Sequence, residues 1–241
     1  MASTRPDGRR PDELRPVRIL TGVQKDPAGS VQIELGQTKV LCAASISDGV
    51  PGWMKGKGRG WLTAEYAMLP GAVPNRGARA PGGRGTEIQR LIGRALRAAV
   101  DLAALGERTL TLDCDVLQAD AGTRVASITG GWLAARLAFD RLVHDHQLAR
   151  TPLTRQLVAI SCALVDGQAV LDPCYDEDHR AQVDANFVLD DQGRLVEVQA
   201  TAEGQPFERA QLDAMLELAA QGARRLLEAQ QAALAAVQPQ K

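Results

Sequence analysis

A strand-turn-helix segment over residues 110–131, LTLDCDVLQADAGTRVASITGG, constrains this chain most. Its first part reads as a strand, and its last part is an apolar run that favours a helix. Gly122, Thr123 and Arg124 stand where the turn meets this helix. The free N–H groups and positive dipole end of a helix attract an oxyanion, and glycine lets the backbone approach it closely. With the Thr123 hydroxyl and the Arg124 guanidinium, the segment is a candidate phosphate site, although the tripeptide is also typical of an ordinary turn and cap.

A second helix start also carries an arginine. Apolar residues recur at spacings of three and four from Ile88 to Val100, which predicts a helix that begins after Thr86. Thr86 and Gln89 fit a capping box at that start. Arg84 lies just before it, so we expect a second guanidinium beside a helix N-terminus.

An acidic block, YDEDH over residues 175–179, precedes a predicted strand that begins at Asp184. The turn between them can bring Asp178 and Asp184 together, and two carboxylates can hold a hard cation through oxygen ligands. A solvated acidic loop is the alternative. His179 beside these carboxylates could act as a base or a ligand, whereas His144 and His146 have no recognisable catalytic spacing, and none of the three is assigned to the site.

β-like runs followed by helix occur in both halves of the chain. Residues 30–35 and 38–46 suit a hairpin in the first half, whereas residues 48–85 are basic and irregular apart from the WLTAEY piece. The second half has expected strands at residues 157–165, 168–171, 184–189 and 195–201, the last two joined by a hairpin turn, and then a long helix from about Glu208. We predict an α+β fold of two similar halves, residues 1–150 and residues 151–241.

Composition excludes several classes of protein. Twenty-eight basic and 29 acidic residues leave a net charge of -1, so any contact with nucleic acid needs a local basic patch. The four cysteines are isolated and no leader precedes them, which predicts reduced thiols and a cytoplasmic protein. No apolar run approaches the roughly 20 residues that span a membrane.

Six segments, in this order and over almost the whole chain, resemble the ribonuclease PH family of phosphate-dependent 3′-to-5′ exoribonucleases, also called tRNA nucleotidyltransferases. They are RPDGRRPDELRPV (residues 5–17), KGKGRGWLTAEYAMLP (55–70), GGRGTEIQRLIGRALRAAVDL (82–102), LDCDVLQADAGTRVASITG (112–130), YDEDHRAQVDANFV (175–188) and VEVQATAEGQPF (196–207).

The resemblance implies the RNase PH-type fold, which is ribosomal protein S5 domain 2-like, in one compact domain. Residues 1–150 would carry the phosphate-binding and RNA-contacting segments, and residues 151–241 the acidic catalytic segment. It implies a phosphate pocket of Arg84, Gly122, Thr123 and Arg124, with Asp178 and Asp184 as catalytic or Mg²⁺-binding acids. Inorganic phosphate would attack the 3′ end of tRNA precursors, and of rRNA as a further substrate, and release nucleoside diphosphates. The reverse reaction would add nucleotides.

The resemblance also places tRNA contacts in residues 68–81, where Arg76 and Arg79 would bind the phosphate backbone. Gly71 stands where the family has an arginine and Val73 where it has a small polar residue, which should weaken RNA anchoring. Family members form homohexameric rings, each a trimer of dimers, and we expect the same here.

Two departures lie beside the phosphate pocket: Ala121 replaces a usual glycine and Val125 a usual threonine, and both affect the expected pocket geometry. A hydrolytic metal-dependent nuclease and a catalytically silent RNA-binding ring subunit remain as alternative functions. Because the arginines and both acidic residues are present, the silent subunit is disfavoured.

Overall fold

The computed structural model describes residues 5–79 and 82–237. Its first sheet has five strands in the order β1-β2-β3-β5-β4. These are β1 (Val17–Thr21), β2 (Gly29–Leu35), β3 (Thr38–Asp48), β4 (Trp61–Met68) and β5 (Arg108–Gln118). All neighbours are antiparallel except β4 and β5, which run parallel. The carboxyl ends of β4 and β5 therefore lie at the same edge of the sheet, where the chain turns into α3 (Thr123–His144).

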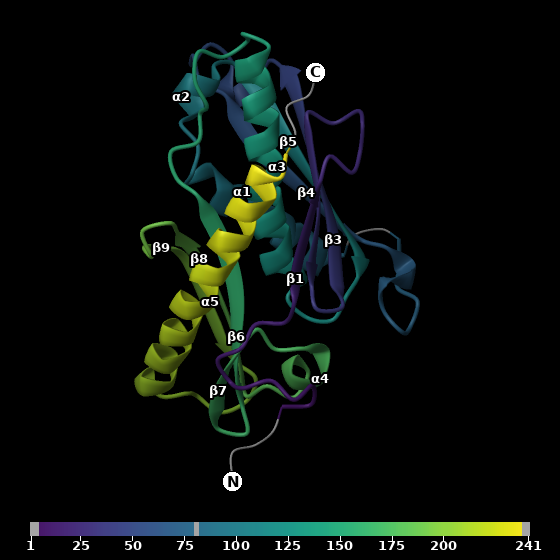
Figure 1. Cartoon of the computed structure of the whole chain (residues 1–241), viewed down its shortest axis with the longest axis vertical. Coiled ribbons are helices and arrows are strands. Elements are labelled where there is room, and N and C mark those ends of the chain that lie inside the picture. Colours follow the sequence, from purple (N-terminus) through teal and green to yellow (C-terminus); the bar gives the residue numbers. More distant parts are fainter. Residues whose placement is uncertain (1–4, 80–81, 238–241) are drawn as a thin grey trace.

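The second sheet has four antiparallel strands in the order β7-β6-β8-β9. They are β6 (Leu157–Val165), β7 (Gln168–Leu171), β8 (Val183–Asp190) and β9 (Leu195–Ala202), and the long α5 (Arg209–Ala235) packs on β6 and β7. Two sheets with their helices confirm the predicted α+β fold (Figure 1). No helix in the part of the chain that the structure describes is long and apolar enough to cross a membrane.

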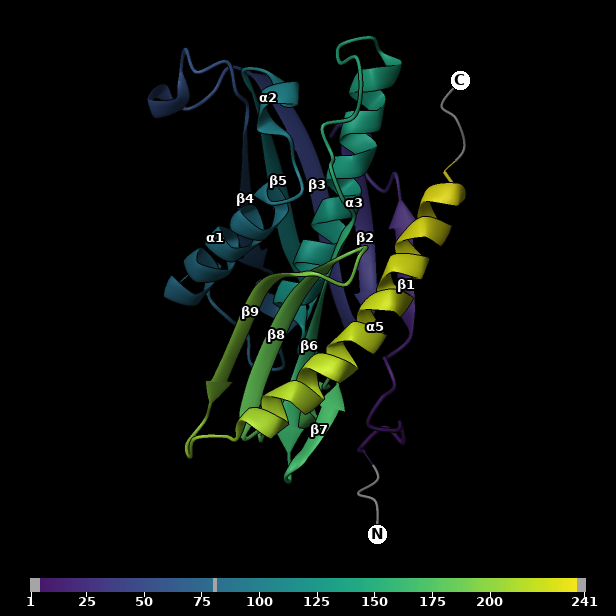
Figure 2. The same cartoon turned by 90° about the vertical axis from the view of Figure 1, so that its left-hand side faces the viewer.

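α3 lies between the two sheets, in contact with β2 and β3 on one side and β6 on the other (Figure 2). Residues 125–135 of this helix are all buried, as expected for a stretch of helix without charged side chains. At Gly130 a Cβ would lie 2.8 Å from both Cys42 Sγ and Ile33 Cγ2, so glycine permits the close packing of helix on sheet. This packing fixes the N-terminal end of α3 at the junction of the two sheets.

Both predicted hairpins are confirmed. Leu35 pairs with Thr38 across the first turn, and β8 and β9 are joined by the turn predicted from residues 190–193. The structure also contains four short helices: η1 (Gly52–Met54), η2 (Pro70–Ala72), α2 (Leu102–Leu105) and α4 (Tyr175–Asp178).

The predicted start of the first long helix is wrong. α1 runs from Gly83 to Arg97, so Thr86 lies inside it and cannot cap it; its N–H donates to the Gly82 carbonyl oxygen instead. The first residues of this helix include two glycines, and because glycine is a poor helix former, helix propensity places the start too late. The earlier start places Arg84 in the first turn of α1.

Candidate active site

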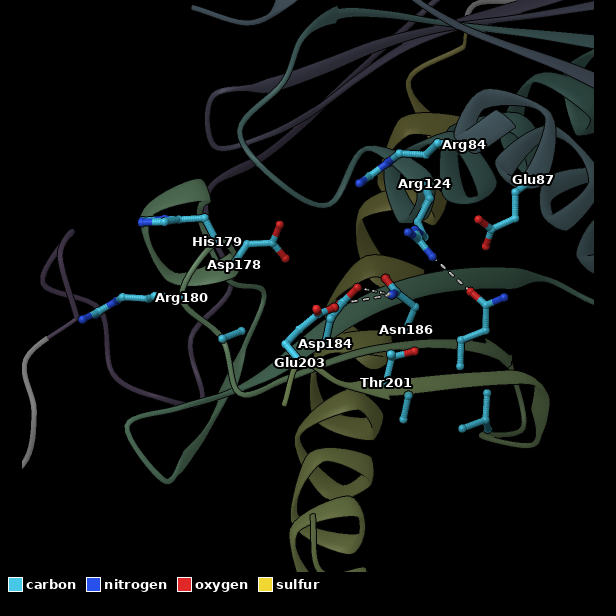
Figure 3. Close-up of a pocket in the computed structure, with 14 residues that line it drawn as sticks. Arg84, Glu87, Arg124, Asp178, His179, Arg180, Asp184, Asn186, Thr201 and Glu203 are labelled. Carbon is cyan, nitrogen blue, oxygen red and sulfur yellow. Dashed lines mark hydrogen bonds between the residues drawn. The ribbon is translucent and has the colours of Figure 1, made fainter. Parts of the chain in front are cut away.

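A cavity of about 1000 Å³ opens at the junction of the two halves (Figure 3). The first turns of α1 and α3 border it on one side, and α4, β8 and β9 on the other. Its lining residues are Arg84, Glu87, Arg124, Asp178, His179, Arg180, Ala181, Asp184, Asn186, Val198, Gln199, Ala200, Thr201 and Glu203. Four of the six predicted catalytic and phosphate-binding residues are therefore brought together, from segments far apart in the sequence.

Arg84 and Arg124 bring positive charge to this cavity, whereas Arg180, which also lines it, pairs with Asp166 at 3.5 Å. Each stands in the first turn of its helix, α1 and α3 respectively, and both guanidinium groups extend into the same space as the two acidic residues (Figure 3). Arg124 Nη1 donates a hydrogen bond of 3.1 Å to Gln199 Oε1 on β9. This bond ties the start of α3 to the second sheet and holds one guanidinium in place.

Gly122 and Thr123 do not line the cavity, but they directly precede Arg124 at the start of α3. Gly122 has a φ of +67°, a left-handed conformation that glycine adopts without strain. A Cβ there would lie 3.1 Å from Arg15 Nη2. Ala121, the departure from the family pattern, also has a positive φ of +55°, which strains a residue with a side chain. The tight turn that exposes the helix N–H groups thus depends on two consecutive left-handed residues.

Asp178, at the end of α4, and Asp184, near the start of β8, both point into the cavity (Figure 3). Burial raises the pKa of Asp178, and the nearby negative charge of Asp184 raises it further. Burial likewise raises the pKa of Asp184. Arg84 and Arg124 oppose both shifts without cancelling them. The two carboxylates thus lie in a setting where added positive charge would stabilise them.

This pair of carboxylates fits a magnesium ion. Mg²⁺ is usually held by one or two carboxylates together with water and substrate phosphate, rather than by a full protein cage. No group of three or more His, Cys, Asp or Glu side chains that could hold a metal ion occurs among the described residues. Asp178 and Asp184 are the residues that would hold the ion.

Asn186 also lines the cavity, although it was not predicted from the sequence as a site residue. Its Nδ2 donates to Asp184 Oδ1 at 3.2 Å, while its Oδ1 lies 2.7 Å from Ser161 Oγ. Because an amide oxygen only accepts, Ser161 is the donor, and this bond turns the amide nitrogen toward the carboxylate. Alternation along β8 places Asp184 and Asn186 on one face, so the period of two could have revealed Asn186.

Arg76 and Arg79 do not line the cavity. Both are exposed on the segment that follows η2, which projects from the body of the molecule (Figure 1). Ala80 and Pro81, the end of the predicted RNA-contacting segment, lie outside the described residues. His179, omitted from the predicted site, does line the cavity, where its ring stacks on Tyr175.

Two family models match this chain. The model described as "3′ exoribonuclease family, domain 1" covers residues 13–138, and "3′ exoribonuclease family, domain 2" covers residues 156–222. The chain is similar to ribonuclease PH of Synechococcus elongatus, with 53% identity over 97% of this chain and 100% of the relative. It is also similar to ribonuclease PH of Roseobacter denitrificans, with 52% identity over 96% and 100% of the two chains.

Solved structures show the same fold. Rice Rrp46 matches with a TM-score of 0.80 at 18% identity, over 95% of this chain and 100% of that one. A subunit of an Archaeoglobus fulgidus exosome with RNA bound to the active site matches with a TM-score of 0.78 at 24% identity, over 93% and 91% of the two chains. At these identities the likeness extends to the fold alone.

Proposed function

We propose a mechanism for this chain, which belongs to the 3′ exoribonuclease family, the family of ribonuclease PH. The protein is a phosphorolytic 3′-to-5′ exoribonuclease of tRNA processing, with inorganic phosphate as its co-substrate. Phosphate attacks the terminal phosphodiester, a nucleoside diphosphate leaves, and the shortened RNA keeps a 3′-hydroxyl. The reverse reaction adds a nucleotide from a diphosphate. rRNA 3′ ends are a further proposed substrate.

One observation carries the assignment of residues: two guanidinium groups, each in the first turn of a helix, face the same cavity as two half-buried carboxylates. The attacking phosphate and the scissile phosphodiester are both negative and repel each other. Arg84 and Arg124 would offset this repulsion and hold the two groups in line, since guanidinium forks match phosphate oxygens. Gly122 and Thr123 would add helix N–H groups and a hydroxyl to the phosphate.

Asp178 and Asp184 would act on the phosphoryl group and on the ribose oxygen that departs from it. When bound to them, Mg²⁺ would stabilise negative charge on the phosphoryl and departing ribose oxygens. A protonated Asp178 or Asp184 would instead donate a proton to the ribose oxygen, and the raised pKa of each carboxyl favours that role. Asn186 keeps the Asp184 carboxylate oriented in either case.

RNA outside the cavity would be held by Arg76 and Arg79 through the phosphate backbone, with no role in the chemistry. A homohexameric ring, as a trimer of dimers, would bring several such loops around one RNA and raise the local positive potential of a nearly neutral chain. We further propose a cytoplasmic location and a boundary between the halves near residue 150.

The test is an RNA with a 3′ extension, incubated with Mg²⁺ in the presence and absence of inorganic phosphate. We expect phosphate-dependent release of nucleoside diphosphates. Nucleoside monophosphates without added phosphate would establish the hydrolytic nuclease instead. No release in either condition would contradict the proposal and favour the silent RNA-binding subunit.

Arg124→Ala tests the phosphate assignment within that assay. Loss of a charge-assisted contact should raise the KM for phosphate at least tenfold, on the order of 1.5–3 kcal/mol. Arg90→Ala is the matched control, because Arg90 is exposed on α1 and does not line the cavity. Normal phosphate saturation in Arg124→Ala would remove Arg124 from the pocket.

A further inference from the structure

The phenol of Tyr66 contacts Thr123, the first residue of α3. Tyr66 lies on β4, where Leu62, Ala64 and Tyr66 alternate toward the interior, and only 5% of its surface is exposed. Its hydroxyl oxygen lies 2.8 Å from Thr123 Oγ1. Because β4 and β5 are parallel, the end of β4 meets the turn that leads from β5 into α3. A strand residue outside the cavity thus contacts the expected phosphate-binding turn directly.

The chemistry of the two hydroxyl groups indicates which one donates. Within residues 5–79 and 82–237, neither hydroxyl has another hydrogen-bond partner. A phenol is a stronger acid than an aliphatic alcohol and therefore the better donor, while the alcohol oxygen is the better acceptor. Burial raises the pKa of Tyr66, so the phenol keeps its proton at neutral pH. With Tyr66 as donor, the Thr123 proton is left for another acceptor.

The surroundings indicate what that acceptor is. Arg84 and Arg124 are close enough to Tyr66 for their positive charges to act on its phenol and partly oppose the effect of burial on its pKa. The Tyr66–Thr123 pair therefore lies within the field that would attract an anion. Thr123 is also the first residue of α3, whose free N–H groups point out of the helix end.

We propose that Tyr66 is a positioning residue for phosphate: its O–H donates to Thr123 Oγ1, fixes that side chain, and directs the Thr123 O–H toward a phosphate oxygen at the start of α3. This inference rests on the proposed function. Tyr66 itself does not touch phosphate in this arrangement, and no covalent step involves it. The effect of losing its hydroxyl should therefore pass entirely through Thr123.

Tyr66→Phe removes the hydroxyl and keeps the ring. We expect the KM for phosphate to rise about five- to tenfold, the effect of one lost hydrogen bond, with kcat and the KM for RNA within about twofold of wild type. Thr63→Val is the matched control: it removes a hydroxyl from the other face of β4, so its KM for phosphate should stay unchanged.

A double-mutant cycle separates positioning from packing. Thr123→Val should raise the KM for phosphate, and adding Tyr66→Phe should have no further effect on it. A wild-type KM for phosphate in Tyr66→Phe would overturn the proposal, as would equal effects of Tyr66→Phe in both backgrounds. A loss of kcat together with a lower Tm would show a packing role and overturn it as well.

A binding measurement keeps this inference separate from the proposed function. Inorganic phosphate should raise the Tm of the wild-type protein, and Tyr66→Phe should reduce that shift at equal phosphate concentration. This result would support the orientation of Thr123 even if the released nucleotide were a monophosphate. An equal phosphate-induced shift in both proteins would contradict it.

Discussion

At the scale of the residue, Asp184 shows a conflict between stability and function. Burial raises its pKa, whereas Arg124 and the amide of Asn186 favour the charged form. The folded protein therefore holds this proton at pH values where the unfolded chain has lost it. Stability should fall as pH rises from the ordinary pKa of 3.8 through the raised value, and the cost remains at neutral pH.

Asp184→Asn tests this account through both properties. We expect loss of turnover, at least a hundredfold in kcat, with RNA binding largely intact. The Tm should be higher than that of the wild type at pH 7, and the difference should shrink as pH is lowered, because the wild-type carboxyl becomes neutral too. Wild-type turnover would remove Asp184 from the mechanism, and a Tm difference independent of pH would contradict its raised pKa.

Single residues differ in how far the sequence could reveal them. Arg84, Asp178 and Asp184 stand in recognisable segments and were predicted. Tyr66 was not assigned to the site, since its contact with Thr123 depends on how β4 packs against the start of α3. Such a contact arises from tertiary structure and leaves no local pattern.

At the scale of the element, the N-terminal segment joins the two sides of the site. Arg15 Nη2 bonds Asp172 Oδ1 at 2.7 Å, and Arg15 Nη1 lies 3.3 Å from Asp120 Oδ2. Asp120 Oδ1 in turn accepts the N–H of Tyr175, the first residue of α4, at 2.9 Å. One carboxylate in the turn before Gly122 thus also holds the short helix that carries Asp178.

Asp120→Ala should separate these two parts of the site. We expect kcat to fall about tenfold, since a small misplacement of reacting groups is costly, while the affinities for phosphate and RNA change less. Asp120→Asn keeps an acceptor for the Tyr175 N–H and should recover part of kcat. Steady-state kinetics measure kcat in both variants, and the Tm of each variant shows that the two have lost the same stability. Equal kcat values in Asp120→Ala and wild type would exclude the coupling.

Local sequence patterns predicted most long elements but not the short ones. The hairpin at residues 35–38 and the α5 start follow from turn and periodicity signals that act within a few residues. α4 was not predicted, because a single turn of helix depends on contacts from outside it, such as the hydrogen bond that Asp120 accepts from the Tyr175 N–H. β4 was only partly recognised, since its flanking Gly-rich and basic residues resemble an irregular loop.

At the scale of the whole molecule, RNA binding must rely on local charge. The net charge is -1, and Arg76 and Arg79 lie on an exposed projecting segment away from the cavity. The convergence of α1, α3, α4 and β8 on one cavity could not be read from local patterns, because it depends on α3 being buried between two sheets. The family resemblance supplied that long-range information.

Arg76→Ala and Arg79→Ala should weaken RNA binding without changing the KM for phosphate. Each should lower the slope of log K against log salt by about one, as expected for a lost phosphate contact. Arg90→Ala serves again as a control on an exposed arginine. An unchanged salt slope in the double variant would show that the projecting segment does not bind RNA.

The central claim is that inorganic phosphate, bound between the starts of α1 and α3, is the nucleophile. The most direct test uses ³²P-labelled inorganic phosphate with unlabelled RNA and Mg²⁺, followed by separation of the nucleotides. We predict that the label appears in the β-phosphate of the released nucleoside diphosphate, at a rate reduced in Arg124→Ala. Release of nucleotides that carry no label would contradict the account.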